Sequence, residues 1–129
     1  MPVALSETAR RLLDAKTYVT LSTINTDGTP HASVVWARRD RDDVLISTTT
    51  ARQKARNLSK DPHVSVSFFD PDEPFVYAGI RGEATVSEEG GRELIDELSV
   101  KYTAGTYPAE PEGTVRVVIR VTPDRVLGR

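Results

Sequence analysis

Apolar side chains recur at every second position along much of this chain, and this period constrains its fold more than any other feature. Within the segment 63–69, valines and a phenylalanine alternate with serines, and valines and an isoleucine recur in the same way from 115 to 121. A period of two places successive side chains on opposite faces of an extended strand. The chain is therefore predicted to be mainly β.

Turn signals and helix caps divide the chain into elements. The segment 25–28 contains an Asp-Gly pair, which favours a tight hairpin turn. Gly79 and Gly82 interrupt a predicted strand and indicate a bulge or a bend. We expect strands at residues 18–24, 29–39, 44–49, 63–69, 75–86 and 115–121, with a short additional one at 125–128. We expect helices from Ser6 to about Lys16, from Ala51 to Lys60 and from Ser87 to about Tyr102. The remaining turns and loops are expected at 38–43, 70–74 and 103–113.

Strands joined mostly by tight turns, with a few short helices, predict an antiparallel barrel with helices at its edge. The segment Gly79-Ile-Arg-Gly82 lies inside a predicted strand and lacks the glycine spacing of a dinucleotide-binding turn. A Rossmann unit is therefore not expected.

Composition narrows the class of function. The chain has 129 residues and a formal net charge of -2, which fits one domain over residues 1–129 and argues against a surface built for nucleic acid. It contains no cysteine, so disulfides and thiolate chemistry are excluded and a reducing cytoplasmic setting is expected. Residues 1–15 lack the apolar region of a secretory signal, and no run of about 18 apolar residues could span a membrane.

The segment 47–58 carries the most specific chemistry of the chain. Hydroxyl side chains at the end of a predicted strand are followed by three cations, Arg52, Lys54 and Arg56. Thr50 and Gln53 fit a capping box that would begin a helix at Ala51. Free amides and the helix dipole at such a start favour an anion, so we predict a phosphate seat. The alternative is a capped basic helix whose charges are only solvated.

The order of elements and three motifs resemble the pyridoxamine 5′-phosphate oxidase-like split β-barrel family, and within it the deazaflavin-dependent reductases, including those that reduce biliverdin. The motifs are Leu21-Ser-Thr with Asp27-Gly-x-Pro30, Arg52-x-Lys-x-Arg-Asn-Leu58, and the closing Val121-x-Pro-Asp-Arg-Val-Leu-Gly128. The resemblance covers nearly the whole chain. It implies a homodimeric, FMN-binding-like split barrel with a flavin or the deazaflavin coenzyme F420 in grooves between subunits.

The resemblance also implies the residues of a cofactor site. Those implied to hold the phosphate are Ser47, Thr48, Thr49, Arg52, Gln53, Lys54 and Arg56. Those implied to run along the ring system are Ser33, Val34 and Val35, through their backbone amides, and Trp36. Trp36 has a structural alternative as a core or dimer-interface aromatic.

The expected activity is hydride transfer from reduced F420 to a conjugated acceptor, such as a quinone, an enone or a tetrapyrrole like biliverdin. The cofactor carries the chemistry, so no catalytic side chain is assigned; a proton could come from solvent, Lys54, His31 or Tyr77. The chain stops at Arg129 without the Arg- and His-bearing segment of the pyridoxamine phosphate oxidases proper, which disfavours vitamin B6 oxidation.

Other functions remain open. FMN would suit the same phosphate seat, and a carrier of flavin or deazaflavin would use it without turnover. A plain interaction domain predicts no tight cofactor binding. Only His31 and His63 could supply imidazole, so neither a haem ligand nor a metal site is expected.

Overall fold

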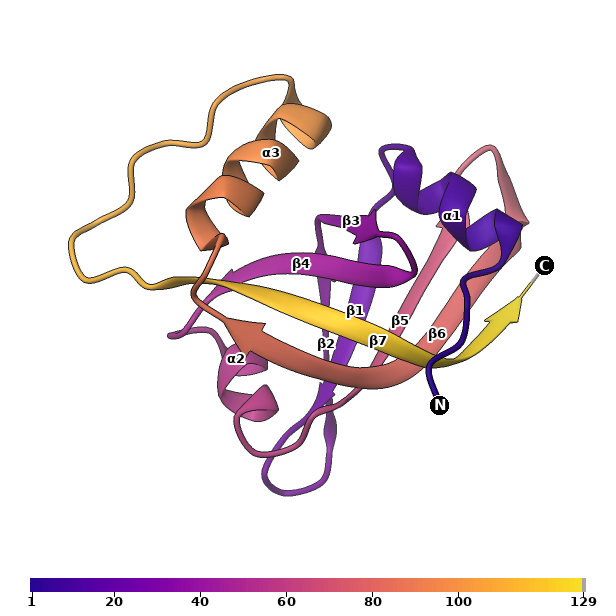
Figure 1. Ribbon diagram of the computed structural model, residues 1–129, viewed down its shortest axis with the longest axis horizontal. Coiled ribbons are helices and arrows are strands. Elements are labelled where there is room, and N and C mark those ends of the chain that lie inside the picture. The colour runs from indigo at the N-terminus through magenta and orange to yellow at the C-terminus, as the bar shows by residue number, and fades with distance from the viewer. Residues whose placement is uncertain (129) are drawn as a thin grey trace.

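The computed structural model describes residues 1–128 and contains one antiparallel sheet with three helices (Figure 1). The strands are β1 (Val19–Ile24), β2 (Pro30–Val35), β3 (Ala37–Asp40), β4 (Asp43–Thr49), β5 (His63–Asp70), β6 (Glu73–Ser87) and β7 (Arg116–Gly128). The helices are α1 (Glu7–Asp14), α2 (Gln53–Leu58) and α3 (Gly91–Thr103).

The sheet is curled, and the reason lies in its strand order. The seven strands follow the order β2-β1-β5-β6-β7-β4-β3, so β2 and β3 form the two opposite edges. Only Trp36 separates these strands along the chain. Consecutive Cα atoms are about 3.8 Å apart, so the two edges must approach each other at Trp36. The sheet therefore closes into a barrel at this junction, although β2 and β3 do not pair with each other.

The core fills the concave side of the sheet, and the long strands β6 and β7 cross it. Val19, Val66, Ile80 and Ile119 are fully buried there, and α1 contributes Leu12 and Leu13 to the same cluster. Along β5 the burial alternates residue by residue, as the period of two in the sequence predicts. The mainly β, barrel-like architecture predicted from the sequence is confirmed.

A bulge lies where the glycine in β6 predicts one. The pairing of β6 with β7 shifts between Arg81 and Gly82. A Cβ atom on Gly82 would come within 2.1 Å of the Thr122 carbonyl oxygen. Only glycine permits this close approach of two backbones, so the bend between the two longest strands depends on this residue.

Two strand predictions are wrong. The segment 29–39 is not one strand, because β2 pairs with β1 and β3 pairs with β4, and the chain changes partner at Trp36. Conversely, the stretches predicted at 115–121 and 125–128 form the single strand β7, which passes through Pro123 beside the bulge. The expected loop 70–74 is also shorter, since β5 extends to Asp70 and β6 begins at Glu73.

Two helix starts are wrong as well. Helix α2 begins at Gln53, its N-cap residue is Arg52, and no side chain caps it, so the capping box from Thr50 to Gln53 does not form. It ends at Leu58 rather than Lys60. Helix α3 begins at Gly91 after the left-handed Gly90, with φ 77°. Ser87 instead accepts a hydrogen bond from the Glu89 amide.

Within residues 1–128, no helix has the length and apolarity needed to cross a bilayer. In the same part of the chain, no group of three or more His, Asp or Glu side chains is arranged to hold a metal ion.

Candidate functional site

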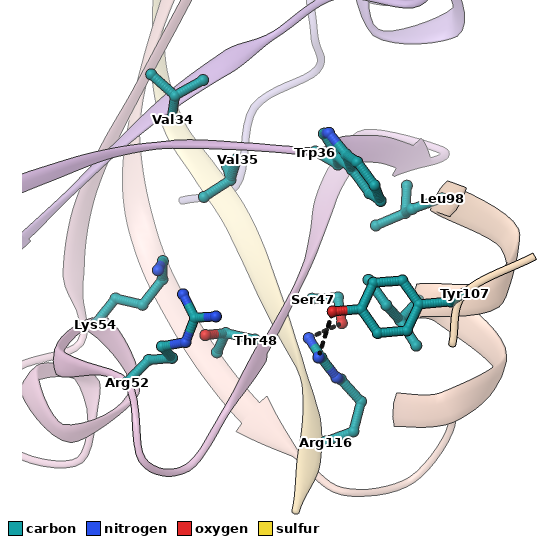
Figure 2. Close-up of a pocket in the computed structure, with 11 residues that line it drawn as sticks. Val34, Val35, Trp36, Ser47, Thr48, Arg52, Lys54, Leu98, Tyr107 and Arg116 are labelled. Atoms are coloured by element: carbon teal, nitrogen blue, oxygen red, sulfur yellow. Dashed lines mark hydrogen bonds between the residues drawn. The ribbon is translucent and has the colours of Figure 1, made fainter. Parts of the chain in front are cut away.

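A cavity of about 240 Å³ opens beside the junction of β2 and β3 (Figure 2). Its walls come from this junction, from β4, from the start of α2, from one face of α3 and from the first residue of β7. The lining residues are Val34, Val35, Trp36, Ser47, Thr48, Arg52, Lys54, Ile95, Leu98, Tyr107 and Arg116.

Most residues predicted to bind a cofactor line this one cavity, although they come from three separate segments of the chain. The fold brings Val34, Val35 and Trp36 opposite Ser47, Thr48, Arg52 and Lys54. In Figure 2 the α2 side chains lie on one side of the cavity and the aromatic side chains on the other.

The other predicted residues lie outside the lining. Thr49 borders a separate hollow next to the connection between β4 and α2. Gln53 and Arg56 bond each other, and Gln53 also donates to Asn57. Ser33 is partly buried on β2, and its hydroxyl has no hydrogen-bond partner among the described residues.

Lys54 is the most unusual side chain of the cavity. It is only 7% exposed, and within residues 1–128 its ammonium group has no hydrogen bond and no ion pair. Burial lowers the pKa of Lys54 below its ordinary value, and the nearby positive charge of Arg52 lowers it further. A buried cation without a counter-charge costs free energy, which a bound anion would recover.

The position of Lys54 is fixed by the way α2 docks on β1. The buried Asn57 donates hydrogen bonds to Thr23 and to Asn25, each at 2.9 Å. Asn57 is only 1% exposed, and its neighbour Leu58 on the same helix is buried as well. These contacts hold the short helix against the barrel, and its first turn then presents Lys54 to the cavity.

Trp36 serves both the cavity and the core. Its ring stacks on that of Tyr102, with centroids 5.3 Å apart and an interplanar angle of 8°. The Tyr102 hydroxyl donates to the Thr17 carbonyl at 2.6 Å and accepts from the Ala37 amide at 3.1 Å. Helix α3 therefore anchors the point where β2 and β3 diverge, and the two interpretations of Trp36 do not exclude each other.

Arg116 is a cavity residue that the sequence analysis missed. It lies at the start of β7, opposite Thr49 of β4, and its guanidinium donates to the Ser47 hydroxyl at 3.3 Å. It also forms an ion pair with Glu110 and lies against the ring of Tyr107. Only the pairing of β4 with β7 reveals this position, because nothing near Arg116 in the sequence signals it.

The cavity is therefore positively charged. Arg52, Lys54 and Arg116 line it, and Glu110 is the carboxylate paired with one of them. Serine and threonine hydroxyls lie between the cations, and an apolar wall of Trp36 and Leu98 faces them (Figure 2). Such a cavity suits a ligand with an anionic end and a flat apolar part.

The curled sheet whose edges meet only at Trp36, with this cavity beside the junction, defines a split β-barrel. The family model described as pyridoxamine 5′-phosphate oxidase matches residues 5–129, and the chain belongs to this family. The family resemblance drawn from the sequence is confirmed.

Solved structures agree with this assignment. The chain is 30% identical to a protein named F420 reductase, with a TM-score of 0.83, over 93% of this chain and 96% of that one. It is 28% identical to a conserved hypothetical protein of Mycobacterium tuberculosis, with a TM-score of 0.73, over 97% of this chain and 84% of that one.

A putative pyridoxamine 5′-phosphate oxidase of Listeria innocua, 20% identical with a TM-score of 0.73 over 92% of both chains, shares the fold. Among curated proteins no match was found. The fold is thus that of flavin- and deazaflavin-related oxidoreductases.

Proposed function

We propose that this protein is an F420-dependent reductase that binds the deazaflavin coenzyme in the cationic cavity and reduces a conjugated organic acceptor. The observation that carries the proposal is Lys54, a buried cation at the cavity wall with no counter-charge among the described residues. The similarity to a protein named F420 reductase supports the choice of cofactor.

The residues present fit the cofactor's phosphate. Lys54 and Arg52 supply positive charge, and the hydroxyls of Ser47 and Thr48 supply donors beside them. Helix α2 has only six residues, so these side chains, rather than the helix dipole, carry the argument. Gln53 and Arg56 on α2, and Thr49 at the end of β4, would support the seat from outside the lining.

The ring system fits the other half of the cavity. Val34 and Val35 of β2 form one wall and Trp36 another, and the backbone of Ser33, Val34 and Val35 offers polar groups along the strand. When bound, reduced F420 supplies a hydride. The protein binds and orients the two reactants and excludes water, and the proton that completes the reduction comes from water or a cavity side chain.

We also propose that the protein works as a homodimer. A volume of about 240 Å³ is below the roughly 300–1,000 Å³ of ordinary small-molecule sites, so one protomer supplies only part of the enclosure. The convex face of the sheet exposes Tyr18, Phe69, Phe75 and Leu127. Val34 is 68% exposed at the cavity rim, so a second copy on this face would border the cavity.

The acceptor would be a quinone, an enone or a tetrapyrrole such as biliverdin. It would lie against the exposed side of the cofactor ring, near the connection between α3 and β7. Two alternatives use the same seat: FMN as the cofactor, and a protein that binds flavin or deazaflavin without turnover.

Equilibrium titration with F420, and separately with FMN, tests the proposal. Trp36 is the one tryptophan of the chain and lines the cavity, so its fluorescence reports binding. We expect a dissociation constant of about 1–10 μM for F420, or roughly −7 to −8 kcal/mol, and weaker binding of FMN. A preference for FMN would assign the flavin alternative, and binding of neither would refute the cofactor site.

Turnover separates an enzyme from a carrier. Reduced F420 is mixed with the protein and menadione or biliverdin, and oxidation of the cofactor is followed by its absorbance. Acceptor-dependent oxidation supports the reductase, whereas tight binding without oxidation by any acceptor class supports the carrier.

A further inference from the structure

The connection between α3 and β7 is held over the cavity by two arginines. We call residues 104–115 the strap; it leaves α3 in the upper part of Figure 1 and returns as the long orange segment to β7. Arg92 donates to the carbonyls of Tyr107 and Pro108. Among the described residues, every other polar contact between 106–112 and the barrel involves Arg116 or Arg92. One further bond, from the Thr114 amide to the Pro111 carbonyl, lies within the strap itself.

The central contact of the strap is an ion pair at the edge of the cavity, between Arg116 of the lining and Glu110 of the strap. Nε and Nη2 of Arg116 both donate to Oε1 of Glu110. Oε2 of Glu110 is 3.7 Å from Arg92. The side chains of Arg116 and Glu110 are only 11% and 15% exposed, so this pair is formed away from bulk water.

The pair does not use the full geometry of a guanidinium. Arg and a carboxylate form their strongest contact with two parallel bonds to two oxygens, but here both bonds end on one oxygen. The remaining Arg116 nitrogen, Nη1, points to the Ser47 hydroxyl at 3.3 Å. An incoming carboxylate could therefore satisfy Arg116 at least as well as Glu110 does.

The surroundings define the rest of the ligand. Tyr107 lies against the guanidiniums of Arg92 and Arg116, with Cζ atoms 5.5 Å and 5.3 Å from its ring centroid. Trp36 and Leu98 supply flat and aliphatic surface across the cavity (Figure 2). A planar apolar body with a carboxylate matches this end of the cavity in both shape and charge.

We propose that Arg116 is a carboxylate-binding subsite, which Glu110 fills until an aromatic carboxylate replaces it and releases the strap. As an assignment of the acceptor, this rests on the proposed reductase function and selects carboxylate-bearing acceptors over neutral ones. Glu110 acts as an internal competitor. The apparent affinity of the ligand is its intrinsic affinity multiplied by the fraction of molecules in which the strap has released Arg116.

The test uses 2-naphthoate as the probe and 2-naphthamide as its neutral counterpart, titrated calorimetrically into the full-length protein. Wild type should bind the carboxylate more tightly than the amide. Glu110→Gln removes the competitor and should tighten naphthoate binding about tenfold, as expected if the strap is closed in about nine molecules of ten, with no change for the amide. Arg116→Lys keeps a charge but loses the planar fork, and should reduce the preference for the carboxylate.

Glu112→Gln is the matched control, because Glu112 is exposed on the same strap and its replacement changes the net charge equally. It should leave both affinities unchanged. Equal tightening by Glu110→Gln and Glu112→Gln would mean general electrostatics and would overturn the proposal. Unchanged naphthoate affinity in Glu110→Gln would overturn it as well.

Limited proteolysis gives a second readout that does not depend on a variant. Saturating naphthoate should accelerate cleavage within residues 106–112 of the wild type, because the ion pair that holds the strap is broken. Slower cleavage there would show that the strap closes on the ligand instead, which contradicts replacement of Glu110.

The F420 and FMN titrations separate this proposal from the function. If F420 binds and naphthoate shows no Glu110-dependent change, the subsite is wrong and the reductase stands. If naphthoate behaves as expected and neither cofactor binds, the cofactor site is wrong and the carboxylate subsite stands.

Discussion

Lys54 is buried and Lys101 is partly buried, and the two lysines differ in what they contact. Burial lowers the pKa of each below its ordinary value. Lys101 on α3 donates to the carbonyl oxygens of Leu13 at 2.6 Å and Ala37 at 2.7 Å. Lys54 on α2 has no such partner within residues 1–128.

The difference separates a structural lysine from a binding lysine. Lys101 links α3 to the end of α1 and to the start of β3, so its burial stabilises the chain itself. Lys54 is more buried than Lys101 but faces a cavity, so an anion beside it would offset the cost of its burial. Burial and pKa alone do not distinguish the two; the partners do.

The largest effect on stability should come from Lys101→Met. The substitution removes the ammonium donor shared by the Leu13 and Ala37 carbonyl oxygens, and each hydrogen bond to a charged group contributes about 1.5–3 kcal/mol. The Ala37 oxygen keeps the Tyr102 hydroxyl at 3.1 Å, so the loss falls mainly on Leu13. We expect the free energy of unfolding to fall by about 2–4 kcal/mol, since relief of the buried charge offsets part of the loss. Urea denaturation measures it. A loss below about 0.5 kcal/mol would show that the carbonyls find water and that Lys101 is not structural.

Lys54→Met should weaken cofactor binding rather than the stability of the fold. We expect F420 affinity to fall by roughly 1.5–3 kcal/mol, the range for a hydrogen bond to a charged group, while the free energy of unfolding stays level or rises. The same titration and denaturation experiments measure both quantities. Lys60→Met is the matched control, because Lys60 is exposed in the turn that follows α2, and it should change neither. If Lys54→Met binds F420 like wild type, Lys54 does not belong to the site.

Much of the α2 side of the site could be predicted from the sequence because its signals are local. Lys54 and Arg52 follow a hydroxyl-rich strand end, and the structure places them with Ser47 and Thr48 in one cavity. The predicted start of α2 is wrong because Thr50 pairs with β7's side of the sheet instead of capping the helix. Its amide bonds the Val115 carbonyl at 3.1 Å, which continues the strand pairing, so the helix begins later.

The α3 side could not be predicted, because it depends on contacts between distant segments. Arg116 reaches the cavity through the register of β7 on β4, and Tyr102 reaches Ala37 across 65 positions of sequence. The sequence predicts one continuous strand through Trp36, because no turn residue separates the two halves of 29–39. The break appears only when the two halves are seen to pair with different neighbours.

Tyr102→Phe tests the role of the α3 side of the site. It keeps the stacked ring beside Trp36 but removes a hydroxyl that serves the Thr17 carbonyl and the Ala37 amide. We expect the free energy of unfolding to fall by about 1–2 kcal/mol, one net buried hydrogen bond and the desolvation of its partners, with F420 affinity almost unchanged. A large loss of affinity with intact stability would mean that the junction itself orients the cofactor.

The smallest effect should be the pH dependence, and it distinguishes the two lysines within one protein. Because burial lowers both pKa values, the unfolded chain binds more protons between each lowered pKa and the ordinary value near 10.5. The free energy of unfolding should therefore rise with pH across that window.

Cofactor affinity should also depend on pH. An anion beside Lys54 favours its charged form and raises its pKa, so F420 should bind less tightly as pH rises through the lowered pKa of Lys54. Lys54→Met should abolish this dependence and Lys101→Met should keep it. If F420 affinity is equally flat with pH in wild type and in Lys54→Met, the ammonium group of Lys54 does not pair with the cofactor, and the contrast between the two lysines must have another cause.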